Sequence, residues 1–160
     1  MSKALPVGSL GSPESPDATD AAVAVYRTRL VAVPERFAVA RRSVGAQLRL
    51  WGYTGLIDAA AMCVTELLAN VHRHVSSHEC GLALHALPEG VRVSVSDRSS
   101  TLPVVPAEPD WHAERGRGLF LLSCTADAWG AEPTPTGKEV WALLRSPLPP
   151  PLSAGPGRTD

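Results

Sequence analysis

Hydrophobic residues in this chain recur every three or four positions over two long stretches and every second position over several short ones. The first long stretch begins at Pro34, where a helix tolerates a missing N–H, and ends before Gly52, a residue suited to capping a helix. The second runs from about Leu56 to Val75. Both are predicted to be amphipathic helices, and each must bury its apolar side against another element.

The short stretches predict five β-strands. Residues 25–32 open the fold, residues 79–87 and 91–97 form a hairpin, and residues 126–132 and 138–144 close it. A third helix is predicted from the segment "ERGRGLFLLSCTAD", which follows a glycine-containing entry. Helices and strands in this order favour an α/β two-layer sandwich, with the helices packed on one face of a mostly antiparallel sheet.

The chain length of 160 residues suits one domain with a sizeable core. Residues 1–23 and 146–160 are rich in proline, serine and glycine, so we predict disordered tails on either side of a folded domain at residues 24–145. Residues 98–113 contain three prolines and no periodicity, which predicts a long loop that is either a lid or disordered.

Charge and cysteine content narrow the function classes. The net charge of −1 excludes a global electrostatic field that would recruit nucleic acid or an anionic membrane. Cys63, Cys80 and Cys124 fit neither a disulfide framework nor a zinc pattern, and predict buried thiols in a reducing cytosol. With no recognisable leader and no run of 18 apolar residues, we expect a cytoplasmic protein without a membrane span.

Three polar side chains stand out in the second helix. Glu66, Asn70 and His74 are four residues apart in an otherwise apolar segment. At about 100° per residue, Glu66 and Asn70 lie about 40° apart on the margin of the apolar face, where a helix borders a pocket. The alternative is that they are solvated groups on the helix surface, as most charged helical residues are.

Asp97 ends the strand that contains Val91, Val93 and Val95. Because alternate residues of a strand share a face, Asp97 is predicted to point inward with the valines, where its carboxylate needs partners. The alternative is a turn-initiating aspartate that bonds to the backbone two residues further on.

The entry to the third helix has features of a phosphate site. Gly116 and Gly118 let backbone N–H groups approach a ligand, and Arg115 and Arg117 add positive charge to the helix N-terminus. The alternative is a flexible helix entry.

Together and in this order, the segments "TELLANVHRH", "VSVSDRSS", "RGRGLFLL", "ADAWG" and "GKEVWALL" resemble the GHKL-type (Bergerat) ATP-binding fold. More narrowly, they resemble the small anti-sigma-factor serine/threonine kinases and related ATP-binding regulators of actinobacteria. The resemblance covers roughly residues 24–145. It implies ATP and Mg²⁺ as ligands, and a sigma factor and an anti-sigma-factor antagonist as protein partners in transcription regulation. It leaves a homodimer open.

The resemblance also implies a role for each motif residue. Asn70 would place its amide oxygen on Mg²⁺, Glu66 would act as the base on the attacking hydroxyl, and His74 would support the site. Asp97 would accept a hydrogen bond from the adenine amino group. The phosphates would be held by the third-helix entry, with its backbone at Gly116, Arg117, Gly118 and Leu119 and with charge from Arg115 and Arg117.

Two positions depart from the family pattern. Many relatives have glycines shortly after the aspartate, whereas this chain has Ser99 and Thr101, whose side chains would crowd the adenine or stiffen the lid hinge. Glu139 stands where relatives often have an adenine-side threonine, which leaves Thr136 as a substitute.

Two functions therefore stay open: an anti-sigma-type protein kinase that phosphorylates a small antagonist, or a non-catalytic regulator that acts through protein contacts alone. Direct nucleic-acid binding by the arginines of the first helix is disfavoured because no aromatic stacking platform accompanies them. A histidine metal cluster is disfavoured because His72 and His74 lie on different sides of their helix.

Overall fold

The structure, a computed structural model, describes the backbone of residues 22–102 and 117–146, and the side chains of the same residues apart from 117–120. Its α-helices are α2 (Pro34–Trp51), α3 (Ile57–His74) and α4 (Arg117–Thr125), with a short 3₁₀ turn, η2 (Thr54–Leu56), before α3. Its strands are β1 (Ala24–Val31), β2 (Glu79–Leu87), β3 (Gly90–Asp97), β4 (Ala128–Thr134) and β5 (Gly137–Arg145).

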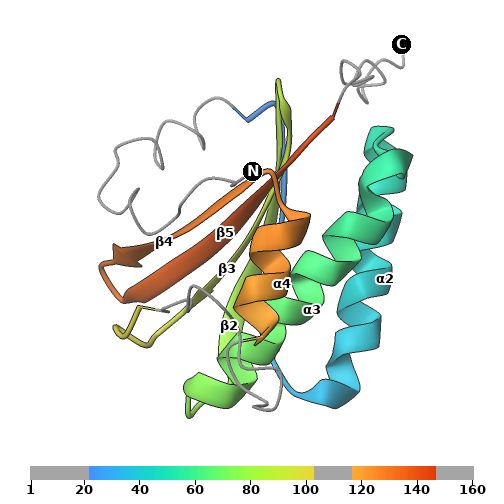
Figure 1. Cartoon of the computed structure of the whole chain (residues 1–160). Coiled ribbons are helices and arrows are strands. Elements are labelled where there is room, and N and C mark those ends of the chain that lie inside the picture. The colour runs from blue at the N-terminus through green and yellow to red at the C-terminus, as the bar shows by residue number, and fades with distance from the viewer. Residues whose placement is uncertain (1–21, 103–116, 147–160) are drawn as a thin grey trace.

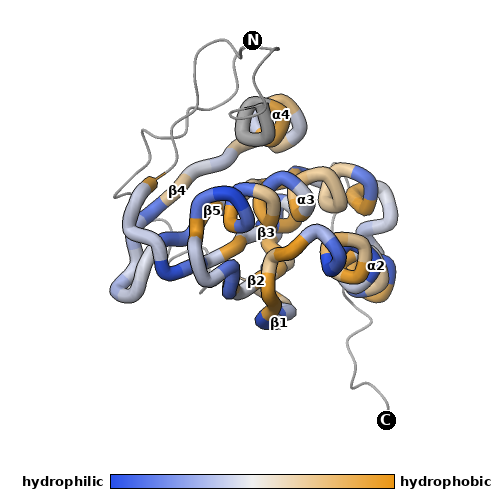
Figure 2. The backbone as a smooth tube through the Cα atoms, turned by 90° about the horizontal axis from the view of Figure 1, so that it is seen from below, coloured by the Kyte–Doolittle hydropathy of each residue, from blue (hydrophilic) through white to orange (hydrophobic). Residues whose placement is uncertain are grey.

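The strands form one sheet in the order β1-β2-β3-β5-β4, and every neighbouring pair is antiparallel. The three helices cover one face of this sheet (Figure 1), and the view from below shows them on the same side of it (Figure 2). The predicted α/β two-layer sandwich is therefore confirmed. The strands at the centre of the sheet, β3 and β5, are separated in sequence by α4 and β4.

The first helix has the predicted ends. Proline occupies its first turn, and Gly52 adopts the left-handed conformation with a φ of 89°. The Gly52 N–H donates to the Arg49 carbonyl oxygen at 3.1 Å, and the Tyr53 N–H donates to that of Leu48 at 2.8 Å. These two bonds satisfy carbonyl groups that the helix end would otherwise leave open.

The central helix, α3, packs against α2, α4, β3 and β5. The segment Thr54–His74 is long and apolar enough, by length and composition, to cross a membrane. In this structure most apolar residues of α3 pack against the sheet and the neighbouring helices, although Met62 is 39% exposed, so α3 is the core helix of a small α/β domain. Its buried residues are Ala60, Cys63, Val64, Leu67, Leu68, Asn70 and Val71.

Two local predictions differ from the structure. We expected the fourth strand to end before Pro133, but β4 continues to Thr134. A proline is tolerated there because β4 is an edge strand, so its missing N–H need not pair on the outer side. We also expected three buried thiols, and Cys124 is instead exposed, because it lies on the outer side of α4.

The predictions for most of the two tails, for residues 103–113 of the loop and for residues 114–116 of the third-helix entry lie outside the described residues. Arg115 and Gly116 are among the residues that the structure does not describe. Arg117, Gly118 and Leu119 form the first turn of α4, where only the backbone is described.

Candidate functional site

The predicted motif residues lie on elements that meet at one end of the molecule. The C-terminal half of α3, the end of β3, the start of β5 and the first turn of α4 all lie toward this end, at the bottom of Figure 1. The antiparallel order produces this meeting, because β3 ends beside the strand end at which β5 begins. Segments that are far apart in sequence, around Glu66, Asp97 and Arg117, are thereby gathered on the helix side of the sheet.

Glu66 and Asn70 occupy the margin of the buried face of α3, as the helical spacing predicts. Asn70 is buried with 5% of its surface exposed, and Glu66 is half-buried. Burial raises the pKa of the Glu66 carboxyl, and the positive charge of Arg73 opposes this rise. Asn70 is therefore not a solvated surface group, and Glu66 is only partly exposed to solvent.

His74 is the last residue of α3 and is exposed. The side chain lies two turns from Glu66, at the helix end rather than within the buried face. An exposed position at the end of the helix suits a supporting role better than direct chemistry in a buried pocket.

Asp97 points inward, as the strand parity predicts, and is 6% exposed. Its Oδ1 accepts a hydrogen bond of 2.8 Å from the Ser99 N–H, so the alternative of a turn-forming aspartate is also realised. The same carboxylate accepts two bonds from the Lys138 ammonium, at 3.0 Å to Oδ1 and 2.9 Å to Oδ2. Lys138 is 2% exposed, so the two residues form a buried ion pair.

Lys138 is the site residue that sequence reasoning missed. A usable signal was present, because Lys138 shares the parity of Val140, Ala142 and Leu144, which are all buried. The strand register then sets Lys138 directly opposite Asp97. Side chains of directly opposed residues lie on the same face, where they are within reach of each other.

The Asp97 carboxylate retains room for one more donor. A carboxylate offers about four acceptor positions, two on each oxygen. Lys138 and Ser99 occupy both positions on Oδ1, and Lys138 occupies one on Oδ2. An adenine amino group could bond only to Oδ2, and because the Asp97 side chain is 1% exposed, neighbouring groups would have to move to admit it.

Glu139 and Thr136 are the two residues considered for the adenine side, and they lie in different surroundings. Glu139 lies on the opposite face of the sheet from Asp97, where its Oε1 is 3.5 Å from an Arg92 guanidinium nitrogen. The Arg92 guanidinium also lies over the ring of Trp141, 5.2 Å from its centroid. Glu139 thus points away from the site, and Thr136 is exposed in the turn between β4 and β5.

The histidines near the end of α3 form a structural contact. The His72 and His78 rings stack with centroids 4.8 Å apart, and the His72 Nδ1 donates to the Ala32 carbonyl oxygen at 3.1 Å. Among the residues the structure describes, no group of three histidine, cysteine, aspartate or glutamate side chains is arranged to hold a metal ion. A Mg²⁺ ion held by Asn70 would thus need most of its ligands from phosphate oxygens and water, which is the usual arrangement for this cation.

No protein-family model matches the chain, and no curated protein matches it. The resemblance to ATP-binding regulators therefore stays a prediction from the five sequence segments.

Proposed function

We propose that this protein binds ATP with Mg²⁺ and acts in the cytoplasm as a serine/threonine protein kinase of the anti-sigma-factor type, exchanging a sigma factor and an antagonist protein as partners. The proposal rests on three segments that all lie toward one end of the molecule (Figure 1): the C-terminal half of α3, which holds Glu66 and Asn70, the end of β3, which holds Asp97, and the first turn of α4. These residues supply a base, an oxygen ligand, a carboxylate for the base edge, and a helix N-terminus for phosphate.

Each residue has a distinct task in this proposal. The Asp97 Oδ2 would accept a hydrogen bond from the adenine amino group, and the amide oxygen of Asn70 would hold Mg²⁺, which would neutralise phosphate charge. Glu66 accepts the proton of an incoming serine hydroxyl. Its half-buried position suits this, because a raised pKa makes the ionised carboxylate a stronger base.

A second candidate function is that of a regulator without catalysis. The ion pair between Asp97 and Lys138 favours it, since three of the acceptor positions of the carboxylate are already occupied within the chain.

The test compares binding with turnover. Titration calorimetry of ATP with and without Mg²⁺ should detect binding that Mg²⁺ strengthens, and Asn70→Ala should remove the Mg²⁺ effect. Asp97→Asn should weaken binding of ATP more than binding of inorganic triphosphate, because only the nucleotide carries the adenine amino group. Absence of ATP binding by the intact chain would reject both the kinase and any nucleotide-dependent regulator.

Glu66→Gln separates the two functions. If Glu66 is the base, this variant keeps its affinity for ATP and loses phosphoryl transfer by about 100- to 10,000-fold. The transfer rate of the intact protein should rise with pH through a range above that of an ordinary glutamate, because the pKa is raised. The variant should lack this rise, whereas bound ATP with no turnover in either form would identify the non-catalytic regulator.

A further inference from the structure

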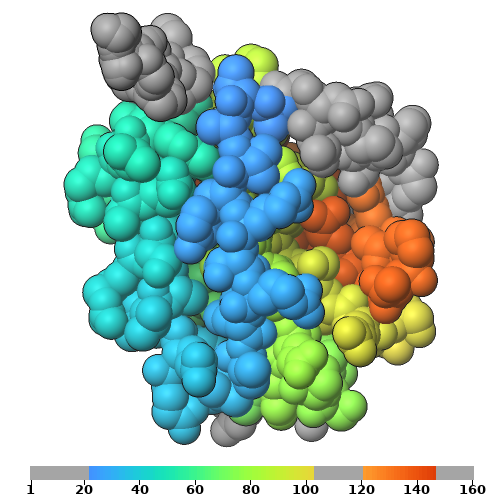
Figure 3. Space-filling view, turned by 180° about the vertical axis from the view of Figure 1, so that it is seen from behind, coloured from blue at the N-terminus to red at the C-terminus, as the bar shows by residue number. Residues whose placement is uncertain are grey.

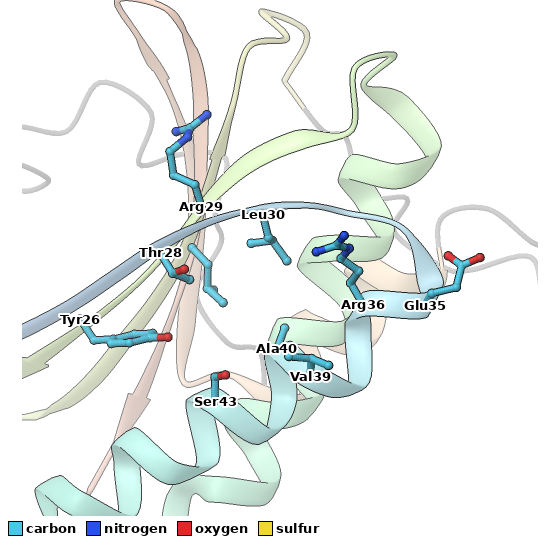
Figure 4. Close-up of a pocket in the computed structure, with 10 residues that line it drawn as sticks. Tyr26, Thr28, Arg29, Leu30, Glu35, Arg36, Val39, Ala40 and Ser43 are labelled. Atoms are coloured by element: carbon cyan, nitrogen blue, oxygen red, sulfur yellow. The ribbon is translucent and has the colours of Figure 1, made fainter.

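The edge of the sheet at β1 carries a groove that the proposed nucleotide site does not use. It has a volume of about 440 Å³ and lies between β1 and α2. Tyr26, Thr28 and Leu30 line it from the strand, and they face Val39, Ala40 and Ser43 on the helix across the opening (Figure 4). Leu82 of β2 completes its apolar floor.

The backbone of β1 is open beside this groove. β1 pairs with β2 over its full length, and no described strand pairs with its other edge. The rear view shows β1 running along the surface with α2 at its side (Figure 3). An edge strand presents unpaired N–H and C=O groups at alternate residues, so it can accept an additional strand.

Apolar side chains at this edge are unusually exposed. Val39, which lines the groove from α2, is 53% exposed, and Val25 and Val31, which alternate with the groove-lining residues of β1 and so lie on the opposite face of the sheet, are 43% and 37% exposed. A strand laid beside β1 would cover such residues with its own apolar side chains. The groove therefore offers apolar contact through Leu30, Val39 and Leu82, and the edge of β1 beside it offers free backbone groups to an extended segment.

Charge selects the kind of segment. Residues 22–52 contain six arginines and one glutamate, a formal charge of +5 in a chain whose total is −1. Arg29 and Arg36 both line the groove, and both are exposed. The single acidic residue, Glu35, also lines the groove at the start of α2, so the two arginines leave the lining with a net positive charge (Figure 4). An approaching strand with carboxylates would face arginines, and one with lysines would face like charge.

The same charge disfavours a second copy of this chain as the occupant. Two β1 edges side by side would bring two sets of arginines together, and charged residues on edge strands are a common device against such self-pairing. Nucleic acid is disfavoured because the groove floor is aliphatic and its described lining holds one aromatic residue, Tyr26.

We propose that the groove between β1 and α2 binds an extended acidic segment of a partner protein, which adds to the sheet as a strand beside β1. The site lies at the edge strand and is independent of ATP binding.

The experiment uses the full chain and a fluorescein-labelled octapeptide of alternating glutamate and valine, with binding followed by fluorescence anisotropy. The control peptide has lysine in place of glutamate, and two further peptides carry N-methyl groups on either the odd or the even residues. We expect the acidic peptide to bind at least tenfold more tightly than the lysine peptide. One of the two N-methylated peptides should lose binding, because only one edge of the added strand bonds to β1.

Matched charge reversals locate the site. Arg29→Glu combined with Arg36→Glu should weaken binding of the acidic peptide at least tenfold and strengthen binding of the lysine peptide. Arg42→Glu combined with Arg49→Glu makes the same charge change at exposed positions of α2 outside the groove, and should leave most of the affinity.

Several results would overturn the proposal. These are equal losses in the two double variants, no binding at millimolar peptide, and equal binding of both N-methylated peptides. Tighter binding of a single-stranded oligonucleotide would show a general polyanion site. A dimer in light scattering that the Arg29→Glu and Arg36→Glu pair dissociates would show that a second copy is the occupant.

Discussion

A lysine and an aspartate that are both removed from water need each other. Taking a charge out of water costs several kcal/mol, and the pair recovers this only through close geometry. The Lys138 ammonium meets both oxygens of Asp97 within 3.0 Å, and the two side chains are 2% and 1% exposed. Loss of one partner would leave the other charged and buried.

We therefore expect Lys138→Met and Asp97→Asn each to lower the free energy of unfolding by about 3 to 5 kcal/mol. The double change of Asp97→Leu with Lys138→Met should lose much less, because it leaves no unpaired charge. Urea denaturation of the four proteins measures these values. Single losses below about 1 kcal/mol would mean that the pair is hydrated and worth no more than a surface ion pair.

For a single residue, the sequence predicts which way the side chain points better than which other side chain it contacts. Strand parity placed Asp97 inward correctly, and helical spacing placed Asn70 on a buried margin. The sequence gives little reason to expect the partner of Asp97, because a lysine is rarely fully buried. The contact depends on the register between β3 and β5, and periodicity within one strand carries no information about register to another.

The elements follow closely from local signals, and the exceptions have physical causes. Helix starts and stops were set by Pro34 and Gly52, whose backbone preferences act without help from the rest of the chain. The end of β4 was misplaced at Pro133, because whether a strand tolerates proline depends on its place in the sheet. The order of the strands had no local signal at all.

Gly137 shows how one element positions another. A Cβ atom there would fall on the Asp97 carbonyl oxygen and on the backbone of Arg98. β5 can therefore begin close against the end of β3 only because residue 137 has no side chain. This approach brings Lys138 to Asp97.

We expect Gly137→Ala to lower the free energy of unfolding by roughly 2 kcal/mol or more, because backbone atoms must separate to admit the methyl group. Gly55→Ala is the matched control, since a Cβ there meets nothing within 4 Å, and its effect should stay within about 0.5 kcal/mol. Thermal or urea unfolding followed by circular dichroism compares the two. Equal effects would show that β5 does not depend on the close approach at Gly137.

Of the three cysteines in the chain, two are buried in the core and one is exposed on the surface. Burial, with the nearby charge of Glu66, raises the pKa of Cys63 to about 12. Burial and Asp97 raise the pKa of Cys80 to about 11, against the opposing charge of Arg29. Cys124 is exposed on α4. The thiolate is the reactive form, so the two buried cysteines are protected both by access and by protonation.

Thiol labelling therefore reports on global unfolding. Near pH 8 a disulfide reagent should modify one thiol per native chain rapidly, and all three after denaturation in urea. Cys124→Ser should abolish the rapid phase. Rapid modification of Cys63 or Cys80 in the native protein would show that the core around α3 opens easily.

The strand order also bears on how the protein is made. β5 is the last element of the sheet in sequence, yet it lies between β3 and β4. While the chain emerges from the ribosome, β3 can pair only with β2 until residues 137–145 have been synthesised. Until then the Asp97 carboxylate also lacks its ion-pair partner, Lys138. The sheet therefore joins β3 to β4 only after β5 has been made, and a nascent chain stalled before β5 would carry β3 with one edge open, as a target for chaperones or for aggregation.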